Sequence, residues 1–319
     1  MNKSNQAIPI VFSLQPHPLL SGLVSGLSAQ TGGFETRYFP DGESYLRIET
    51  QVEQRQCIIL ANLAHPNEKF LPLAFMASTL KELGAESVGL VAPYLSYMRQ
   101  DRRFEAGEAV TSRIFATLLS QQIDWFVTVD PHLHRVHSLQ EIYTVPSTVV
   151  EGAPIIGKWL RSLHDVFLVG PDSESEQWVS QISAQSGHPF VIGEKRRHGD
   201  RDVTIVLPDL SDFTGLTAVI IDDVISSGHT ILQCLKSLNA SGVVSVSCVC
   251  IHGLFADGAE AMLASAGLKE LISTNTIPHQ SNRLDVAEAL LPPIQKHLSG
   301  VTLHARGQSA IKVNKKEQP

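Results

Sequence analysis

Apolar runs and amphipathic segments alternate along most of the chain. Continuous apolar runs predict buried strands at residues 8–14, 57–63, 87–94, 125–130, 166–172 and 217–224. Segments with helical spacing of apolar positions lie at residues 19–27, 75–84 and 231–242. Buried strands separated by helices are typical of a mainly parallel sheet covered on both faces. The pattern therefore predicts an α/β protein.

A faint internal repeat divides the chain into two similar halves. Leu80, Gly84, Ser87, Val88 and Val91 are matched at a constant offset by Leu238, Gly242, Ser245, Val246 and Val249. The offset, 242 − 84 = 158, is about half of the 319 residues. Each copy reads as a helix, a glycine stop and a strand. The repeat predicts two tandem domains, at residues 1–145 and 146–298, followed by a tail at residues 299–319.

Composition narrows the classes of function. The formal net charge is −7 and only 6% of residues are aromatic, which argues against a nucleic-acid partner. No apolar run approaches the ~20 residues of a membrane span, and the first residues lack the apolar core of a signal peptide. We therefore expect a cytoplasmic protein with no membrane partner. The spacing of its four cysteines favours buried, reduced thiols.

The strand predicted at residues 217–224 ends in two carboxylates. The stretch Val219–Thr230 reads VIIDDVISSGHT, in which Asp222 and Asp223 directly follow a β-branched run. Ligands of open α/β sheets bind outside the carboxyl ends of the strands. The two aspartates therefore stand where they can reach the hydroxyl groups of a bound sugar.

Small polar residues then lead into a helix. Such a loop gathers backbone N–H groups at the positive end of the helix dipole, where phosphate binds. Ser226, Ser227 and Thr230 add hydroxyl donors, and Gly228 permits close approach. The segment favours a phosphorylated sugar as ligand, although an ordinary turn fits the same residues. The chain has no Walker A or GxGxxG pattern, so a P-loop NTPase or a dinucleotide-binding protein is not indicated.

The stretch IIDDVISSGHT resembles the phosphoribosyl pyrophosphate loop of the type I phosphoribosyltransferases. Residues 8–295 as a whole resemble the ribose-phosphate pyrophosphokinases, which consist of two tandem type I phosphoribosyltransferase-like domains. Each domain of that family is a mainly parallel sheet flanked by helices. The resemblance implies that ribose 5-phosphate is bound by Arg197, Asp222, Asp223, Ser226, Ser227, Gly228, His229 and Thr230.

Two segments of the first half can be assigned a function only through this resemblance. RYFPDGESYLRI, residues 37–48, is an ordinary turn signal, and APYLSYMRQDRRF, residues 92–104, is a charged loop whose arginines suit polyphosphate oxygens. In the family the first loop usually contacts the adenine bound by a neighbouring subunit, so a homo-oligomer is implied. The resemblance implies that ATP is bound by Phe39, Asp41, Gly42, Glu43, Arg99, Gln100, Asp101 and His132.

Three histidines follow the strand at residues 125–130. His132, His134 and His137 invite a zinc hypothesis, but no cysteine or second ligand cluster lies nearby in the sequence. The resemblance instead implies that His132 coordinates the Mg²⁺ that accompanies ATP. It assigns no role to the other two histidines.

The strand predicted at residues 166–172 also ends in a carboxylate, that of Asp172. The resemblance implies that Asp172 is a second metal ligand. Glu174 and Ser175 stand where the family often has two glycines, so the surrounding loop departs from the family pattern.

The segment GEKRRHGDRDVTI, residues 193–205, is rich in both charges and reads as an exposed hairpin or loop. Its Lys-Arg-Arg resembles the start of the family's flexible catalytic loop. The resemblance implies that Lys195 and Arg197 are the catalytic pair.

The resemblance therefore implies transfer of the β,γ-diphosphoryl group of Mg-ATP to the 1-hydroxyl of ribose 5-phosphate. Two alternatives stay open. A non-catalytic regulatory homologue would keep the fold but is expected to lose the lysine–arginine pair or the metal histidine, and both are present. A phosphoribosyltransferase would share only the phosphate loop, whereas this chain has the additional segments and a whole further domain.

Overall fold

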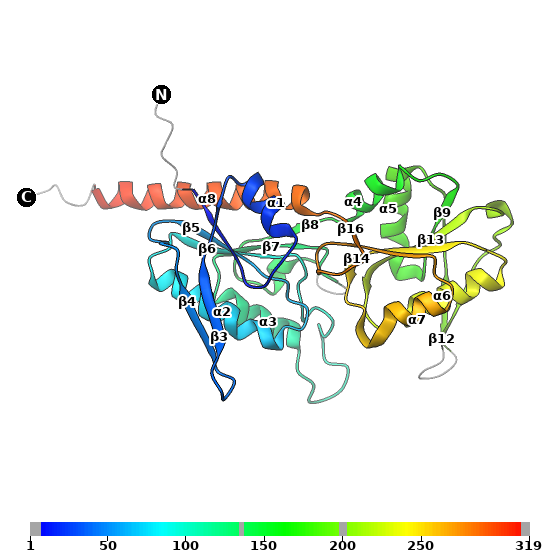
Figure 1. Cartoon of the computed structure of the whole chain (residues 1–319), viewed down its shortest axis with the longest axis horizontal. Helices are drawn as coiled ribbons and strands as arrows, with labels where there is room; N and C mark the ends of the chain where they lie inside the picture. The colour runs from blue at the N-terminus through cyan, green and yellow to red at the C-terminus, as the bar shows by residue number, and fades with distance from the viewer. Residues whose placement is uncertain (1–7, 134–136, 198–202, 314–319) are drawn as a thin grey trace, which may run out of the picture. The chain divides into compact units, whose positions relative to one another are not determined.

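The computed structural model describes residues 8–133, 137–197 and 203–313 (Figure 1). The chain forms two compact units. Unit 1 comprises Met1–Val150 with Ala287–Pro319, and unit 2 comprises Glu151–Val286. In the described part of the chain, no helix is both long and apolar enough to span a bilayer.

Unit 1 contains a parallel sheet of six strands in the order β2-β1-β5-β6-β7-β8. Its strands are β1 (Ile10–Ser13), β2 (Gln30–Thr31), β5 (Gln56–Leu60), β6 (Ser87–Ala92), β7 (Trp125–Val129) and β8 (Ser147–Val150). Its helices are α1 (Leu19–Gly26), α2 (Asn67–Glu82), α3 (Thr111–Ser120), the 3₁₀ turn η1 (Leu139–Glu141) and α8 (Ala287–Val313). Helices α1 and α8 cover one face of the sheet, and α2 and α3 cover the other (Figure 1).

Unit 2 repeats this architecture with the strand order β10-β9-β13-β14-β15-β16, again parallel throughout. Its strands are β9 (Val166–Gly170), β10 (Phe190–Ile192), β13 (Thr217–Ile225), β14 (Val246–Gly253), β15 (Glu270–Thr274) and β16 (Asn282–Leu284). Its helices are α4 (Ala153–Leu160), α5 (Glu176–Ser186), α6 (His229–Ala240) and α7 (Ala259–Ser265), with 3₁₀ turns η2 (Ser173–Ser175), η3 (Ser211–Phe213) and η4 (Ala256–Gly258). Helices α4 and α5 lie on one face, and α6 and α7 on the other (Figure 1).

The predicted α/β class and its doubling are confirmed. Gly84 follows α2 and precedes β6, while Gly242 follows α6 and precedes β14. Both glycines have φ +85°, a left-handed conformation that ends a helix and suits glycine. Strands β6 and β14 occupy the same place in their sheets. The faint sequence repeat therefore marks equivalent helix-to-strand junctions.

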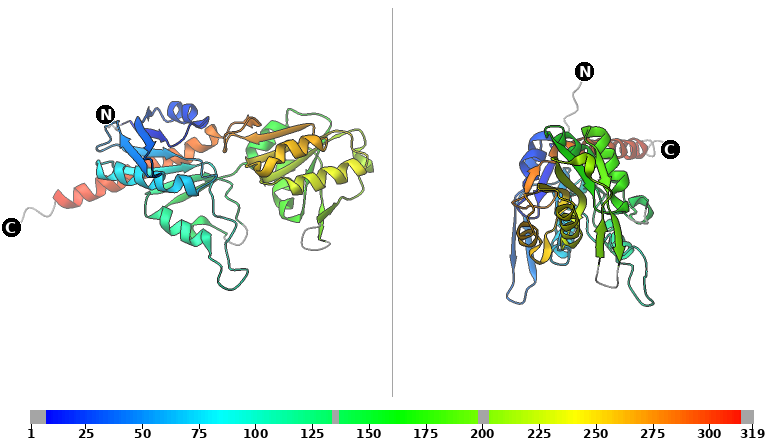
Figure 2. Two further views of the ribbon diagram at one scale, coloured as in Figure 1. Left: turned by 60° about the horizontal axis from the view of Figure 1, so that its bottom comes forward. Right: turned by 90° about the vertical axis from the view of Figure 1, so that its right-hand side faces the viewer.

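Each unit also has an antiparallel hairpin at an equivalent point of the chain. The hairpin β3 (Phe34–Tyr38) with β4 (Ser44–Ile48) separates β2 from β5, and β11 (Glu194–Arg197) with β12 (Val203–Val206) separates β10 from β13. Both project from the sheet of their own unit (Figure 2). These two hairpins carry the segments that the sequence assigns to the nucleotide and to catalysis.

Buried side chains fill both faces of each sheet. In unit 1 the largest is Trp125 on β7, of which 1% is exposed. Gly89 on β6 leaves the room for this indole, because a Cβ there would lie 2.0 Å from the Trp125 ring. All four cysteines are buried and free, and burial raises the pKa of the Cys57 thiol to about 12.

The units divide the chain differently from the predicted boundaries. Strand β8 lies after residue 145 but pairs with β7 of the first sheet. Helix α8, which begins before residue 298, also belongs to unit 1. There His297 stacks on Trp125 with ring centroids 4.8 Å apart, and Gln56 Nε2 donates to the carbonyl of Leu298 at 2.9 Å. The apolar pattern of α8 predicts a helix but does not indicate which sheet it covers.

Candidate active site

The paired aspartates lie near the carboxyl end of β13, which continues beyond them through Val224 and Ile225. Pairing of β13 with β9 stops at Ile220 opposite Val169, so Asp222 and Asp223 extend past their neighbour on that side. The Asp222 carboxylate accepts from the backbone N–H of Asp223 at 3.0 Å. Burial and the negative charges of Asp223 and Asp172 raise the pKa of Asp222 well above its ordinary value. Three carboxylates therefore act on one another at this edge of the sheet.

The loop after β13 leads into α6 through Gly228. This residue has φ +74° and precedes the first helical residue, His229. A Cβ at Gly228 would lie 3.1 Å from the Cβ of Ala259 on α7, so both backbone conformation and packing require glycine here. No side chain caps α6 within the described residues. The first N–H groups of the helix therefore stay available for an anion.

Asp172 directly contacts the residue predicted to be the catalytic lysine. Lys195 Nζ lies 3.6 Å from Asp172 Oδ2, and the two side chains are 32% and 16% exposed. The other oxygen, Oδ1, accepts from the backbone N–H of Glu174 at 3.1 Å, and Ser175 Oγ donates to the carbonyl of Asp172 at 2.6 Å. Glu174 and Ser175 therefore build a 3₁₀ turn that fixes the carboxylate.

The β11–β12 hairpin is anchored at its base. Gly193 N donates to the carbonyl of Gly170 at 2.8 Å, and a Cβ at Gly193 would lie 2.8 Å from the carbonyl oxygen of Pro171. On the second strand, Ile205 is buried and its carbonyl accepts from Ser237 Oγ of α6 at 2.6 Å. Lys195 pairs with Ile205 across the hairpin. Directly opposed residues share a face, so Lys195 points with Ile205 toward the body of unit 2.

Arg197 ends strand β11, two residues beyond Lys195. Its side chain and residues 198–202 lie outside the described part of the structure. The predicted role of Arg197 in catalysis and in ribose 5-phosphate binding therefore stays a prediction.

In unit 1 the predicted nucleotide turn caps the β3–β4 hairpin. Phe39 N donates to the carbonyl of Glu43 at 2.8 Å and Gly42 N donates to the carbonyl of Phe39 at 2.9 Å. Asp41 Oδ1 accepts from Glu43 N at 3.2 Å, and Gly42 has φ +91°. These bonds order the backbone of the turn and leave its side chains at the surface.

The second nucleotide segment forms a loop that closes on Glu108, a residue that the sequence did not single out. Glu108 Oε2 accepts from Phe104 N at 2.7 Å and from Glu105 N at 3.1 Å. These bonds and a bond from the Gln100 side chain lower the pKa of Glu108. In this loop Arg99 is exposed, while Gln100 and Asp101 are half-buried.

The predicted metal ligands belong to different units. His132 follows β7 in unit 1 and is half-buried, whereas Asp172 lies in unit 2. His134 lies outside the described residues, and the backbone N–H of His137 donates to Glu141 at 2.9 Å. Among residues 8–133, 137–197 and 203–313, no three His, Cys, Asp or Glu side chains lie close enough together to hold a metal ion by themselves.

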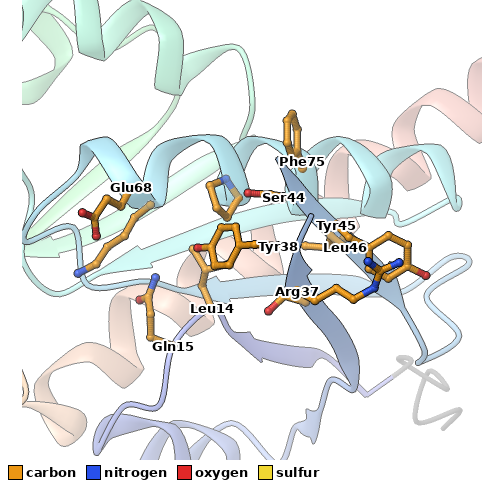
Figure 3. Close-up of a pocket in the computed structure, with 12 residues that line it drawn as sticks. Leu14, Gln15, Arg37, Tyr38, Ser44, Tyr45, Leu46, Glu68 and Phe75 are labelled. Carbon is orange, nitrogen blue, oxygen red and sulfur yellow. The ribbon is translucent and has the colours of Figure 1, made fainter. Parts of the chain in front are cut away.

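A cavity of about 210 Å³ lies between the β3–β4 hairpin and α2 (Figure 3). Tyr38 and Phe75 line its apolar part, and Lys69 lies at its polar end. Lys69 Nζ donates to the carbonyl of Asn62 at 2.9 Å, and burial lowers the pKa of Lys69. Strand β4 packs on α2 beside this cavity, so the hairpin and the helix are in direct contact.

Two similar parallel units, one with a phosphate-type loop after paired aspartates, define a protein of the type I phosphoribosyltransferase class. Residues 9–122 match the family described as the N-terminal domain of ribose phosphate pyrophosphokinase. Residues 138–288 match the phosphoribosyl transferase domain family. The chain belongs to the ribose-phosphate pyrophosphokinase family, a family of transferase enzymes.

Individual relatives agree with this assignment. The ribose-phosphate pyrophosphokinase of Methanothermobacter thermautotrophicus is 34% identical over 79% of this chain and 88% of its own length. That of Methanopyrus kandleri is 30% identical over 87% of this chain and 95% of its own. The crystal structure of phosphoribosylpyrophosphate synthetase from Mycobacterium smegmatis has the same fold, with a TM-score of 0.79, 24% identity, and coverage of 92% of this chain and 99% of that chain.

Proposed function

We propose that the protein is a ribose-phosphate diphosphokinase. It transfers the β,γ-diphosphoryl group of Mg-ATP to the 1-hydroxyl of ribose 5-phosphate, giving phosphoribosyl pyrophosphate and AMP. The 1-oxygen forms a bond to the β-phosphorus, the bond from that phosphorus to the α,β-bridging oxygen breaks, and the hydroxyl proton is released. The observation that carries the proposal is the contact of Lys195 with Asp172, in the unit whose strand β13 carries Asp222 and Asp223 near its carboxyl end.

The sugar half of the reaction belongs to unit 2. Ser226 to Thr230 bind the 5-phosphate through hydroxyls and the uncapped N-terminus of α6. Asp222 and Asp223 hold the ribose 2- and 3-hydroxyls. The aspartates on β13 and the start of α6 thus hold the sugar at two points. This orients the 1-hydroxyl before the transfer begins.

The cationic side chains act on the transferring group. Lys195 and Arg197 stabilise the negative charge that develops between the β-phosphorus and the bridging oxygen. Closure of the catalytic segment over the reactants would exclude water, which is the competing acceptor. The anchored base of the hairpin keeps Lys195 next to Asp172.

The nucleotide half belongs to unit 1. We assign the adenine to Phe39, Asp41, Gly42 and Glu43, and the phosphates to Arg99, Gln100, Asp101 and His132. The hydrogen-bonded turn of Gly42 and the closed loop on Glu108 support these assignments, because internal bonds order the backbone of both segments and leave Phe39 and Phe104 exposed.

The carboxylates of unit 2 fit Mg²⁺. Asp172 already attracts a cation, the ammonium of Lys195, and burial together with the negative charges of Asp223 and Asp172 raises the pKa of Asp222. Mg²⁺ commonly binds through one or two carboxylates and completes its shell with water and substrate oxygens. In unit 2 we assign Asp172 as a metal ligand, and in unit 1 we assign His132 as a ligand of the ion that accompanies ATP. When bound, the ion neutralises charge on the phosphates and orients the substrates.

A homo-oligomer and a cytoplasmic location remain predictions from the sequence. The exposed aromatic turn of the β3–β4 hairpin supports an oligomer, since 39% of Phe39 and 67% of Tyr38 are exposed. Sedimentation velocity over a range of protein concentrations measures the state directly.

The first experiment measures AMP formed from Mg-ATP with and without ribose 5-phosphate, with the sugar product followed by ³¹P NMR. AMP that depends on the sugar, together with an anomeric diphosphate signal, is the expected result. Binding of both substrates without AMP would replace the proposal with a regulatory homologue. Consumption of phosphoribosyl pyrophosphate with a free base would indicate a phosphoribosyltransferase instead.

A further inference from the structure

Arg37 lies between two aromatic rings of the β3–β4 hairpin. Its guanidinium carbon is 4.6 Å from the ring centroid of Phe39 and 4.3 Å from that of Tyr45. The two rings contact each other edge to face, with centroids 6.2 Å apart and planes at 89°. Figure 3 shows the Arg37 side chain extending toward the Tyr45 ring. A cation and two rings thus form one cluster, here called the arginine–aromatic cluster.

The hairpin register explains why these side chains meet. Arg37 of β3 is the direct cross-strand partner of Tyr45 of β4, so both project from one face. Phe39 follows two residues after Arg37 and returns to the same face by strand alternation. The cluster therefore depends on the pairing of β3 with β4 and not on the turn alone.

The Phe39 ring needs such support. Its backbone is held by the turn bonds to Gly42 and Glu43, but the residue lies outside the buried core and 39% of it is exposed. Contacts with Arg37 and Tyr45 restrict the ring at a surface position where it is otherwise free to rotate. An aromatic ring held ready in this way can stack on a base at a lower entropic cost.

We propose that Arg37 is a positioning residue for the nucleotide: it holds the Phe39 ring in the orientation that receives a purine base. The inference rests on the proposed function, because it takes Phe39 as a contact of the adenine. Arg37 acts through Phe39 and Tyr45. Its positive charge interacts with these two rings and not with the phosphates of the nucleotide.

The test compares two arginines of the same hairpin. Arg37→Met keeps an unbranched apolar stem but removes the cation. Arg47→Met is the matched control, because Arg47 is also exposed, lies on β4 and pairs with Glu35 at 3.2 Å and Glu49 at 2.7 Å. An exposed cation–π contact is worth about two- to fivefold in an equilibrium. We expect Arg37→Met to raise the KM for ATP about three- to tenfold, while the KM for ribose 5-phosphate, kcat and the Arg47→Met values change less than about twofold.

Two further variants distinguish the possible causes of a higher KM for ATP in Arg37→Met. Arg37→Lys keeps a cation and is expected to recover part of the affinity for ATP. Phe39→Leu combined with Arg37→Met is expected to equal Phe39→Leu alone, because coupled residues are not additive. Full additivity would overturn the positioning role and indicate that Arg37 contacts the nucleotide directly.

A comparison with Phe39→Leu distinguishes failure of this inference from failure of the proposed function. If Phe39→Leu raises the KM for ATP and Arg37→Met does not, the positioning role is wrong and the nucleotide role of the hairpin stands. If Phe39→Leu leaves the KM for ATP unchanged, the assignment of adenine to this turn is wrong as well. NMR of the nucleotide-free protein gives a direct readout, since loss of the cluster removes the ring-current shift of the Phe39 and Tyr45 protons.

Discussion

At the scale of single residues, the contact between Lys195 and Asp172 links two assignments that the sequence made separately. The ammonium stands 3.6 Å from a carboxylate that we propose as a metal ligand. A cation on that carboxylate must therefore share it with the lysine or displace the lysine. Displacement would free Lys195 for the diphosphoryl group at the moment when the metal and substrates are bound.

We expect Lys195→Ala to lower turnover on the order of 10²-fold or more, as removal of a transition-state donor does. The same substitution should tighten Mn²⁺ binding about two- to fivefold in the absence of nucleotide, because a partly exposed ion pair is worth up to about 1 kcal/mol. Steady-state AMP formation and Mn²⁺ electron paramagnetic resonance measure the two effects.

Lys158→Ala is the control, since Lys158 is an exposed lysine of α4 in the same unit. A Lys195→Ala enzyme with near-normal turnover would refute the catalytic assignment. Unchanged or weaker Mn²⁺ binding would show that Lys195 does not compete with a metal at Asp172.

The need for glycine at position 228 depends on local backbone geometry and can be predicted from the sequence. We expect Gly228→Ala to lower the free energy of unfolding by about 1 kcal/mol, because φ is +74°, and to raise the KM for ribose 5-phosphate. Gly215→Ala is the matched control, since Gly215 has φ +84° and open space around its Cβ position. Chemical denaturation and sugar titrations measure both variants. Equal effects of the two substitutions on the KM would argue against a phosphate role for the loop.

At the scale of elements, the catalytic hairpin is held from two sides. Gly193 packs on the strand end before Asp172, and Ser237 of α6 binds the carbonyl of Ile205. The end of the hairpin that carries Lys195 is therefore fixed by elements far away in the sequence. These two anchors restrict the positions that Lys195 can reach, although neither anchor contacts a substrate.

We predict that Ser237→Ala lowers kcat several-fold, because the base of the hairpin loosens. The control is Ser183→Ala, which removes a similar bond, from Ser183 Oγ to the carbonyl of His188 at 2.7 Å. Each substitution should cost about 1 kcal/mol of unfolding free energy. Parallel kinetics and urea unfolding test the pair, and the hairpin explanation fails if kcat falls equally in both.

At the scale of the whole molecule, one strand order is used twice and the two copies carry different chemistry. Both units place a hairpin after their edge strand, but only in unit 2 does the third strand of the sheet carry paired carboxylates near its carboxyl end. Helix α8 then returns the chain to unit 1, where His297 stacks on Trp125 and Nε2 of His297 lies 2.9 Å from Thr148 Oγ1.

The contact of His297 with Trp125 and Thr148 should make the stability of unit 1 decrease at acidic pH. Burial and the charge of Lys296 lower the pKa of His297 below its ordinary value of 6.5. The unfolded chain thus takes up the proton first, so the contribution to stability is complete above pH 6.5 and declines as pH falls toward the lower pKa of the folded protein. Urea unfolding at pH 8 and pH 5.5, followed by tryptophan fluorescence, measures the difference.

The substitution His297→Gln keeps a hydrogen-bonding group but removes the titration, and we expect it to flatten the pH dependence. His164→Gln, at an exposed position of unit 2, should leave the dependence unchanged. If the free energy of unfolding of the His297→Gln protein depends on pH as steeply as that of the wild type, His297 is not the source of this dependence.

Local patterns along the chain were sufficient to predict the α/β class, the doubling, and the sites that a few consecutive residues define. Paired aspartates at a strand end, a glycine before a helix and a turn at Gly42 depend on local periodicity and backbone geometry, which adjacent residues specify. Tertiary structure alone decided which distant groups meet. The Lys195–Asp172 pair, the Ser237 anchor and the unit that α8 covers depend on the packing of whole elements, and no local pattern encodes those contacts.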